Sequence, residues 1–108
     1  MERFLHLAAE GDYLGMGWVF GTAEGPSLES YPAAEVERRM YALAGLVVSE
    51  SYTIGQGAPQ PRQRGNAAVF HVSLTQGGRT LEVPFTAVSG GDGRWFVESV
   101  AVEAITDR

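Results

Sequence analysis

Few side chains in this sequence have the type and spacing needed for acid–base chemistry. His71 is a candidate general base, but its segment alternates apolar and polar residues, and His71 falls on the polar side, where it would face solvent or a dimer partner. No companion carboxylate is in register with it. His6 has a glutamate four residues away on each side of a short predicted helix, which indicates a surface ion pair rather than a site.

Carboxylate pairs and metal ligands are equally sparse. Glu82 and Glu98 would have to lie close together for acid–base hydrolysis, but the alternation places Glu82 outside and Glu98 at an expected bulge. The two histidines lack the ligand spacing of a zinc site. The chain has no cysteine, which excludes a thiolate metal site, a disulfide scaffold and a cysteine nucleophile. We therefore predict no catalytic residue, no metal ligand and no cofactor.

Length and composition favour one domain spanning residues 1–108. Apolar residues make up 44 % of the chain and charged residues 19 %, which is typical of a protein with a packed core. The net charge of −5 argues against binding to nucleic acid, which needs a basic surface. No apolar run approaches the roughly 20 residues that cross a bilayer. No signal peptide is recognisable, and because an apolar helix starts almost at once, we expect a native segment, such as an export signal and tether, to precede it. The compartment, cytoplasmic or exported, is left open.

Three helices are expected in the first half of the chain. The first runs from Arg3 to Glu10 and ends at Gly11, which suits a left-handed cap. The second runs from Tyr13 to about Phe20, although two glycines weaken it. The longest runs from Pro32 to about Ser49, because proline suits a first helical turn and an apolar stripe recurs at helical spacing. That stripe consists of Val36, Met40, Leu43 and Val47. Residues 21–31 are expected to form a loop.

About four antiparallel strands are expected in the second half. They cover residues 51–54, 66–75, 79–88 and a final segment from Trp95. Residues 55–65 contain two prolines and three glycines and are expected to be a solvated loop. Pro84 indicates an edge or a bulge, and a slip of the apolar positions near Glu98 indicates a bulge that bends the last strand. Helices followed by hairpin strands predict the α+β class, with the helices packed in the concave face of a curved sheet.

The two faces of this sheet differ in composition. The inward positions are almost wholly apolar, whereas the outward positions mix small polar and β-branched residues. In the strand over residues 66–75 the outward residues are Val69, His71, Ser73 and Thr75. Such a face suits sheet-to-sheet packing in a homodimer, and a solvated face is the alternative interpretation. The outer face is therefore our candidate dimer interface.

Two short segments resemble the nuclear transport factor 2-like superfamily. The opening Phe4-Leu5 … Gly11-Asp12-Tyr13 is similar to its first helix pair, and the ending Asp92-Gly93-Arg94-Trp95-Phe96-Val97 is similar to its last strand. The order of elements matches over nearly the whole chain. The resemblance implies a cone of curved sheet closed by helices, often with a pocket at the wide end and dimers through the outer sheet face. Members include ketosteroid isomerases, scytalone-type dehydratases, polyketide cyclases and non-catalytic modules, some of them small exported lipoproteins.

Enzymes of this superfamily use an Asp or His base with Tyr or Asp donors inside the cone. Asp12 beside Tyr13 is the nearest match here, but a helix N-cap explains Asp12 without chemistry, and we favour that interpretation. Aromatic residues could line an apolar pocket in which hydroxyl or indole N–H groups orient a small apolar ligand. The candidates are Tyr13, Trp18, Tyr41 and Trp95. Ordinary core and rim packing is the simpler interpretation of the same residues.

These observations leave three hypotheses of function. The first is a non-catalytic ligand-binding or protein-interaction module that dimerises through its sheet. The second is a small isomerase, dehydratase or cyclase acting on an apolar carbonyl compound, which would need a titratable group inside the cone. The third is an accessory domain of a larger exported assembly. We favour the first hypothesis, because the sequence offers no inward acid–base set.

Overall fold

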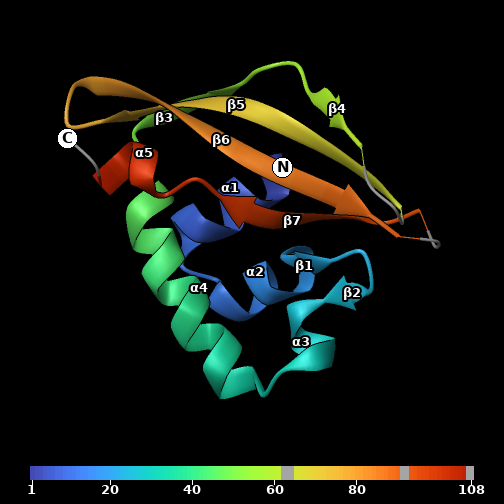
Figure 1. Ribbon diagram of the computed structural model, residues 1–108. Helices are drawn as coiled ribbons and strands as arrows, with labels where there is room; N and C mark the ends of the chain where they lie inside the picture. Colours follow the sequence, from blue (N-terminus) through green and yellow to red (C-terminus); the bar gives the residue numbers. More distant parts are fainter. Residues whose placement is uncertain (62–64, 91–92, 107–108) are drawn as a thin grey trace.

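The computed structural model describes residues 1–61, 65–90 and 93–106. It has two layers, an open, twisted antiparallel sheet and a set of helices packed against one face of it (Figure 1). Helices α1, α2 and α4 lie on the same side of the sheet, and a short C-terminal helix, α5 (Glu103–Thr106), lies against β6 (Figure 1). The predicted α+β class is confirmed, whereas α5 was not predicted.

Two short helices open the chain, as predicted. α1 spans Glu2–Glu10 and ends at Gly11, whose φ of 74° is the left-handed conformation that glycine adopts without strain. α2 spans Tyr13–Val19, and the Asp12 carboxylate accepts a hydrogen bond of 3.0 Å from the Gly15 N–H at its start. This turn fixes the direction of α2 relative to α1 and so places Tyr13.

The longest helix, α4, spans Ala33–Val47, with Pro32 as its N-cap. Its C-terminus is tied to the sheet by Gln76, whose side-chain amide donates to the carbonyl oxygens of Leu46 and Val48 at 2.7 and 2.9 Å. These bonds satisfy acceptors that the end of a helix leaves unpaired. The predicted apolar stripe faces the core, with Leu43 partly buried and Val36, Met40 and Val47 fully so; Ala44, which was not part of the predicted stripe, is buried beside them.

The segment predicted as a loop, residues 21–31, contains regular structure, so that prediction was wrong. It holds β1 (Gly21–Thr22), β2 (Gly25–Pro26) and α3 (Ser27–Ser30). The hairpin depends on a tertiary contact that local sequence does not reveal, because Phe20 forms a parallel bridge to Val97 of the last strand. Gly21 is needed here, since a Cβ at this position would collide with the Gly25 carbonyl oxygen.

The main sheet has five strands in the order β3-β5-β6-β7, with β4 also pairing with β5 on the side that β3 occupies. The strands span Ser51–Ile54 (β3), Ala58–Gln60 (β4), Asn66–Gln76 (β5), Arg79–Ser89 (β6) and Trp95–Val100 (β7). β4 lies within residues 55–65, for which the prolines and glycines predict a solvated loop, and this prediction is wrong at β4. An edge strand tolerates proline, since its outer side needs no donor, and Pro59 occupies such a strand. Residues 62–64 of that predicted loop, and Gly91 and Asp92 of the final turn, lie outside the described residues.

Two predicted irregularities of the sheet are confirmed. The register of β6 on β7 shifts between Thr86 and Ala87, which leaves Glu98 as the extra residue of a bulge. The pairing of β6 with β7 ends at Phe85, so Pro84 lies one residue outside the paired region and β6 is an edge strand on that side. The absent N–H of Pro84 therefore costs the sheet no ladder bond to β7.

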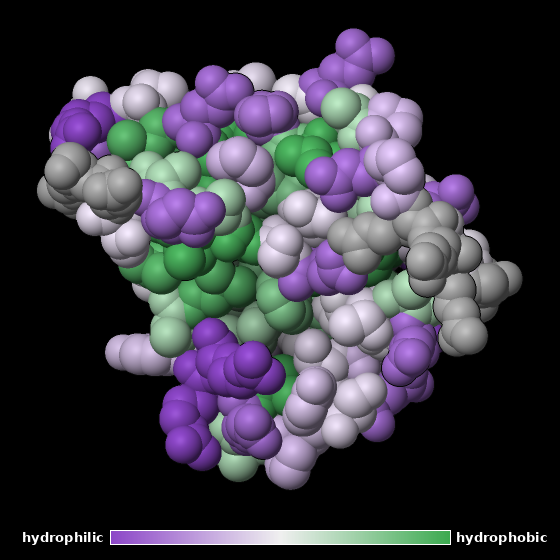
Figure 2. All heavy atoms as spheres, viewed as in Figure 1, coloured by the Kyte–Doolittle hydropathy of each residue, from purple (hydrophilic) through white to green (hydrophobic). Residues whose placement is uncertain are grey.

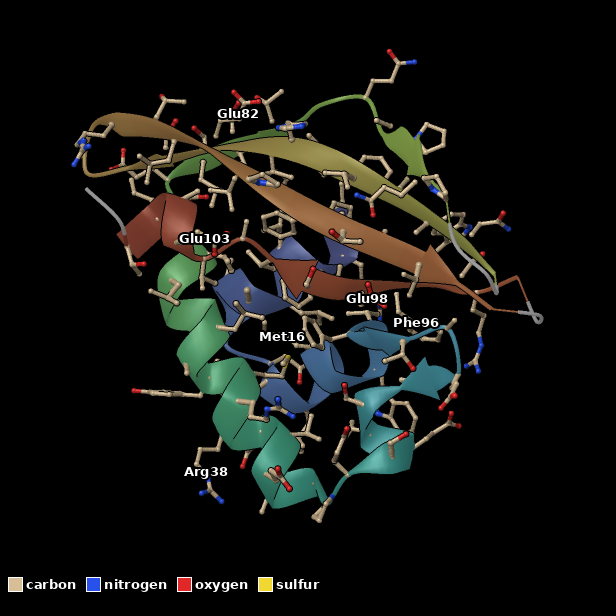
Figure 3. All side chains as sticks on the ribbon, viewed as in Figure 1. Met16, Arg38, Glu82, Phe96, Glu98 and Glu103 are labelled. Atoms are coloured by element: carbon tan, nitrogen blue, oxygen red, sulfur yellow. The ribbon has the colours of Figure 1, made fainter. Side chains whose placement is uncertain are left out.

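The core lies between the helices and the inward face of the sheet. The fully buried ring of Phe4 has its centroid 5.9 Å from that of Phe20 and 6.2 Å from that of Phe85. Met16 of α2 is also fully buried, below the sheet (Figure 3). The sheet contributes alternate residues to this core: Val72, Leu74, Val83, Phe85 and Val97. Apolar side chains from both layers thus pack together between the helices and the sheet.

A second, smaller apolar cluster lies on the outer face, at one end of the sheet. Ala67, Val88 and Phe96 pair side by side across β5, β6 and β7, and each is at most 4 % exposed. The Arg94 guanidinium lies 5.4 Å from the centroid of the Phe96 ring. We expected the outward positions to carry the polar groups, and this cluster corrects that expectation for one end of the face.

Candidate functional site

The groove between α1 and α4 brings together two of the four aromatic residues predicted to bind a ligand. The rings of Tyr13 and Tyr41 meet edge to face, with centroids 5.2 Å apart and planes inclined by 79°. Both border an open hollow of about 440 Å³. Its other walls are mostly small residues of the two helices: Ala8, Ala9, Glu10, Gly11, Ala42, Ala44, Gly45 and Val48.

Local sequence explains why this groove exists. Tyr13 starts α2 directly after the Asp12 cap, and Tyr41 lies on the outer side of α4, where it is 64 % exposed. Gly45, one turn after Tyr41, leaves the space beside α4 open, because a Cβ at this position would meet no atom within 4 Å. The groove can therefore accept an apolar group beside two phenols that can hydrogen-bond to it.

The two tryptophans lie elsewhere. Trp95 is 52 % exposed and lines a separate hollow of about 160 Å³. Trp18 is 54 % exposed on α2. The structure therefore pairs Tyr13 with Tyr41 but does not gather the four predicted residues around one pocket.

The hollow beside Trp95 has a charged rim. Arg3 and Met1 contribute to its lining, together with the core residue Phe4. Burial lowers the pKa of the Met1 amino group, and the neighbouring Glu2 carboxylate opposes that shift. This hollow thus combines a cationic side chain with apolar walls, unlike the groove between α1 and α4.

The outer face of β5 presents the four residues predicted for a dimer interface. Val69, His71, Ser73 and Thr75 alternate with the inward core residues of the strand. Their partners across β6 are Thr86, Pro84, Glu82 and Thr80. The hydroxyl oxygens of Thr75 and Thr80 lie 3.3 Å apart. These outward positions therefore form a surface of mostly short side chains.

His71 has a carboxylate partner that the sequence analysis did not find. Its Nδ1 lies 2.9 Å from Oε1 of Glu82, with the two side chains 54 % and 67 % exposed. Glu82 is directly opposite Ser73, so it reaches His71 as a diagonal neighbour on the same face. The expectation that no carboxylate accompanies His71 was therefore wrong. Glu82 lies on the outer side of the sheet, away from the apolar core (Figure 3), and so does His71, which it contacts.

The other acid–base candidates are not assembled into a site. Asp12 caps α2, as predicted, and His6 Nε2 lies 3.0 Å from Oε1 of Glu10, which confirms a surface pair. Glu82 stands above β6, whereas Glu98 lies at the β7 bulge (Figure 3). Within the described ranges, no three His, Asp or Glu side chains gather as a metal-binding group.

A further hollow, which the sequence analysis missed, lies between α4 and the segment from Phe20 to Ser27. It has a volume of about 150 Å³, and its lining includes Arg39. In the sequence, Arg39 is simply a charged residue beside the apolar stripe of α4, which is typical of any amphipathic helix. The hollow depends on how α3 packs beside α4, so no local pattern predicts it.

No family model, no curated protein and no solved structure matches this chain. Among the residues that the structure describes, no helix combines the length and the apolar character needed to cross a membrane. An assignment of function therefore starts from the geometry of the sheet face and of the hollows between the helices.

Proposed function

We propose that this chain is a non-catalytic interaction module with a nuclear transport factor 2-like cone, and that it pairs with a second copy through the outer face of its sheet. The observation that carries the proposal is the composition of that face. The outward positions of β5 and β6 carry ten side chains, of which Ala67 and Val88 are already buried and Glu82 is the one carboxylate, which contacts His71. The rest are short hydroxyl or apolar residues.

The chemistry of this face fits burial against a copy of itself. Two sheets pack face to face when their side chains are short enough to interdigitate, as rows of threonine, serine and valine are. A two-fold axis places the same patch on both partners, so a face without uncompensated charge is compatible with itself. The contact between His71 and Glu82 provides this compensation within one copy.

The area of the face limits the size of this interface. β5 and β6 have 11 residues each, which corresponds to a length of about 36 Å. Four rows of strands give a width of roughly 15 to 20 Å. The resulting area of roughly 600 Å² is an upper limit, because it includes the end where Ala67, Val88 and Phe96 are already buried, and it lies below the roughly 800 Å² that each partner contributes to a standard interface.

The apolar interior supports a non-catalytic function over an isomerase, dehydratase or cyclase. Such an enzyme would need a titratable group where it can reach a bound substrate. Among the described residues, Ser89 is the one buried polar side chain, and the core between the layers is apolar, so a titratable group would have to come from the wall of a surface hollow, as Glu10 and the two tyrosines do in the groove.

The experiment that tests the proposal is light scattering during size-exclusion chromatography of a Ser73→Arg variant. Ser73 lies in the middle of the outer face, where the long arginine side chain would hold two sheets apart and its guanidinium would compete with His71 for Glu82. We expect the wild type to be a dimer and Ser73→Arg to be a folded monomer. Ser30→Arg is the matched control, because Ser30 is exposed on α3, and it should remain dimeric. A variant Ser73→Arg that dimerises like the wild type would contradict the proposal.

A second candidate function, binding of a small apolar ligand, is favoured by the groove of Tyr13 and Tyr41. Its volume of about 440 Å³ falls within the usual range for ligand pockets. Gly45→Leu should fill the groove and abolish binding of a neutral aromatic probe such as naphthol, whereas Leu14→Ala on α2 should leave binding unchanged. Equal affinity of Gly45→Leu and the wild type for naphthol would exclude this groove as the site.

A further inference from the structure

The hollow between α4 and the Phe20–Ser27 segment combines apolar walls with two polar groups. Phe20, Val36, Met40 and Leu43 form the walls, and Ser27 and Arg39 provide the polar groups. Figure 2 shows hydrophobic surface between α4 and β7, bordered by hydrophilic side chains over the lower half of α4. An apolar cavity with a few convergent polar groups is the usual design of a small-molecule site.

The backbone around this hollow is fixed by hydrogen bonds. The Ser27 N–H donates to the Phe20 carbonyl oxygen at 2.8 Å, and the Ser27 carbonyl oxygen accepts from the Tyr31 N–H at 3.0 Å. These two bonds fix the backbone of Phe20, Ser27 and Tyr31 relative to one another. The backbone that carries the Ser27 side chain is therefore ordered before a ligand binds, which limits the entropy lost on binding.

Tyr31 in turn positions Arg39. The Arg39 guanidinium carbon lies 5.8 Å from the centroid of the Tyr31 ring, within the range of a cation–π contact. A guanidinium that stacks by its face keeps its N–H edge available for a planar anion. Arg39 thus stands at the apolar hollow as a permanent positive charge with a supported orientation.

We propose that this hollow binds a small amphiphilic carboxylate, with its apolar body among Met40, Leu43 and Phe20 and its carboxylate on Arg39. Guanidinium and carboxylate match in geometry and form paired, charge-assisted hydrogen bonds. The Ser27 hydroxyl donates a further hydrogen bond to the same anion. The site lies among the helices, so its occupancy is independent of pairing through the outer sheet face.

Volume limits the size of the ligand. A cavity of about 150 Å³ is comparable to one that accommodates a single benzene ring, as in the engineered lysozyme cavity. The ligand class is therefore an acid with one ring or an equivalent short alkyl chain. A ligand of this size binds in roughly the millimolar range, because few atoms contribute contacts.

Glu35 is the competing carboxylate for Arg39. It lies one turn earlier on α4, at the spacing that lets a glutamate and an arginine interact on a helix. A bound carboxylate must displace the Glu35 side chain from Arg39 or bind beside it against charge repulsion. Replacing Glu35 by Gln should therefore tighten binding of an anionic ligand.

The test is an NMR titration with phenylacetate, with phenylethanol as the neutral analogue. We expect phenylacetate to shift the backbone amides of Met40 and Leu43 and the Nε–H signal of Arg39. Arg39→Gln should weaken binding about threefold to fivefold, because Arg39 is exposed on α4 and solvent weakens its pairing with a carboxylate. Arg38→Gln is the matched control, because Arg38 is the next residue on α4 and projects away from the protein (Figure 3). Its effect should stay below about twofold, in the range of a remote surface charge.

The same titration can overturn the proposal in several ways. Equal affinity for phenylacetate and phenylethanol would show that no cation recognises the ligand. Equal weakening by Arg38→Gln and Arg39→Gln would reduce the effect to general charge. Shifts confined to Ala42 and Gly45 would place the ligand in the groove of Tyr13 and Tyr41 instead. An absence of shifts at millimolar phenylacetate would show that the hollow does not bind small amphiphilic carboxylates.

Discussion

Nδ1 of His71 lies 2.9 Å from Oε1 of Glu82 across the β5–β6 pair, on the outer face of the sheet. The contact engages the one carboxylate that the outward positions of these two strands carry. Without it, pairing of two copies would bring two glutamates into one interface, where desolvation and repulsion would oppose association. The pair therefore links the composition of the face to its proposed use as a homodimer interface.

Single and double substitutions of this pair should affect dimerisation non-additively. In Glu82→Ala, dimer formation would bury His71 without its partner, and in His71→Ala it would bury the Glu82 carboxylate without its partner. Each variant should therefore weaken the dimer about tenfold. The double variant removes both groups and should recover part of the loss. Dissociation constants from analytical ultracentrifugation measure this effect.

The same variants should change the stability of the monomer very little. Both side chains are more than half exposed in the monomer, and exposed pairs contribute less than about 1 kcal/mol. Urea unfolding at concentrations below the dimer dissociation constant provides this comparison. Three variants that all dimerise like the wild type would show that the pair lies outside the interface.

Asp12→Ala should lower the free energy of unfolding by about 1 kcal/mol, because the Gly15 N–H loses the acceptor that caps α2. Asp12→Asn keeps a side-chain oxygen and should retain most of that stability. Urea unfolding monitored by circular dichroism measures both changes. If the two variants were equally destabilised, the role of Asp12 would depend on its charge rather than on capping.

Two helical glycines should respond to alanine in opposite directions. A Cβ at Gly17 would lie 2.5 Å from Cγ1 of Val36 and 2.9 Å from Cγ of Leu28, so Gly17→Ala forces α2 away from α3 and α4. The expected cost is about 1–3 kcal/mol, as for overpacking elsewhere. Gly45→Ala places its methyl group in open space and should stabilise α4 by about 0.5–1 kcal/mol. Unfolding midpoints that move in the same direction for both would contradict this packing.

The elements that the sequence predicted well are those with local causes. Gly11 and Asp12 end one helix and begin the next through their own backbone and side chain, so the turn between α1 and α2 could be placed within a residue. The helical spacing of the apolar residues in α4 likewise predicts which face of the helix is buried. The bulge at Glu98 was visible because it shifts the phase of a simple alternation.

The elements that were missed depend on distant partners. The hairpin of β1 and β2 is fixed by the bridge between Phe20 and Val97. These two residues lie far apart in the sequence, so no local pattern predicts the bridge. Strand β4 was missed because Pro59 is tolerated only through its edge position. α5 is four residues long, too short for a helical period to be recognised.

The candidate sites divide in the same way: features with a local cause were predicted, and contacts between distant residues were not. Tyr13 and Tyr41 meet because each is placed by its own helix and the two helices cross nearby, and the alternation of β5 correctly predicted the outward side of His71. The diagonal reach of Glu82 to His71 required the register of β5 on β6, which the sequence does not specify. The hollow beside Arg39 required the packing of α3 and α4.

The most direct test of the central claim is the mass of the wild-type protein by sedimentation equilibrium over a range of micromolar concentrations. Pairing through the outer sheet face predicts a particle of twice the 11.6 kDa chain mass, and it predicts that Ser73→Arg returns the mass to that of one chain. A wild-type mass of one chain throughout, or a dimer that Ser73→Arg leaves intact, would contradict the claim.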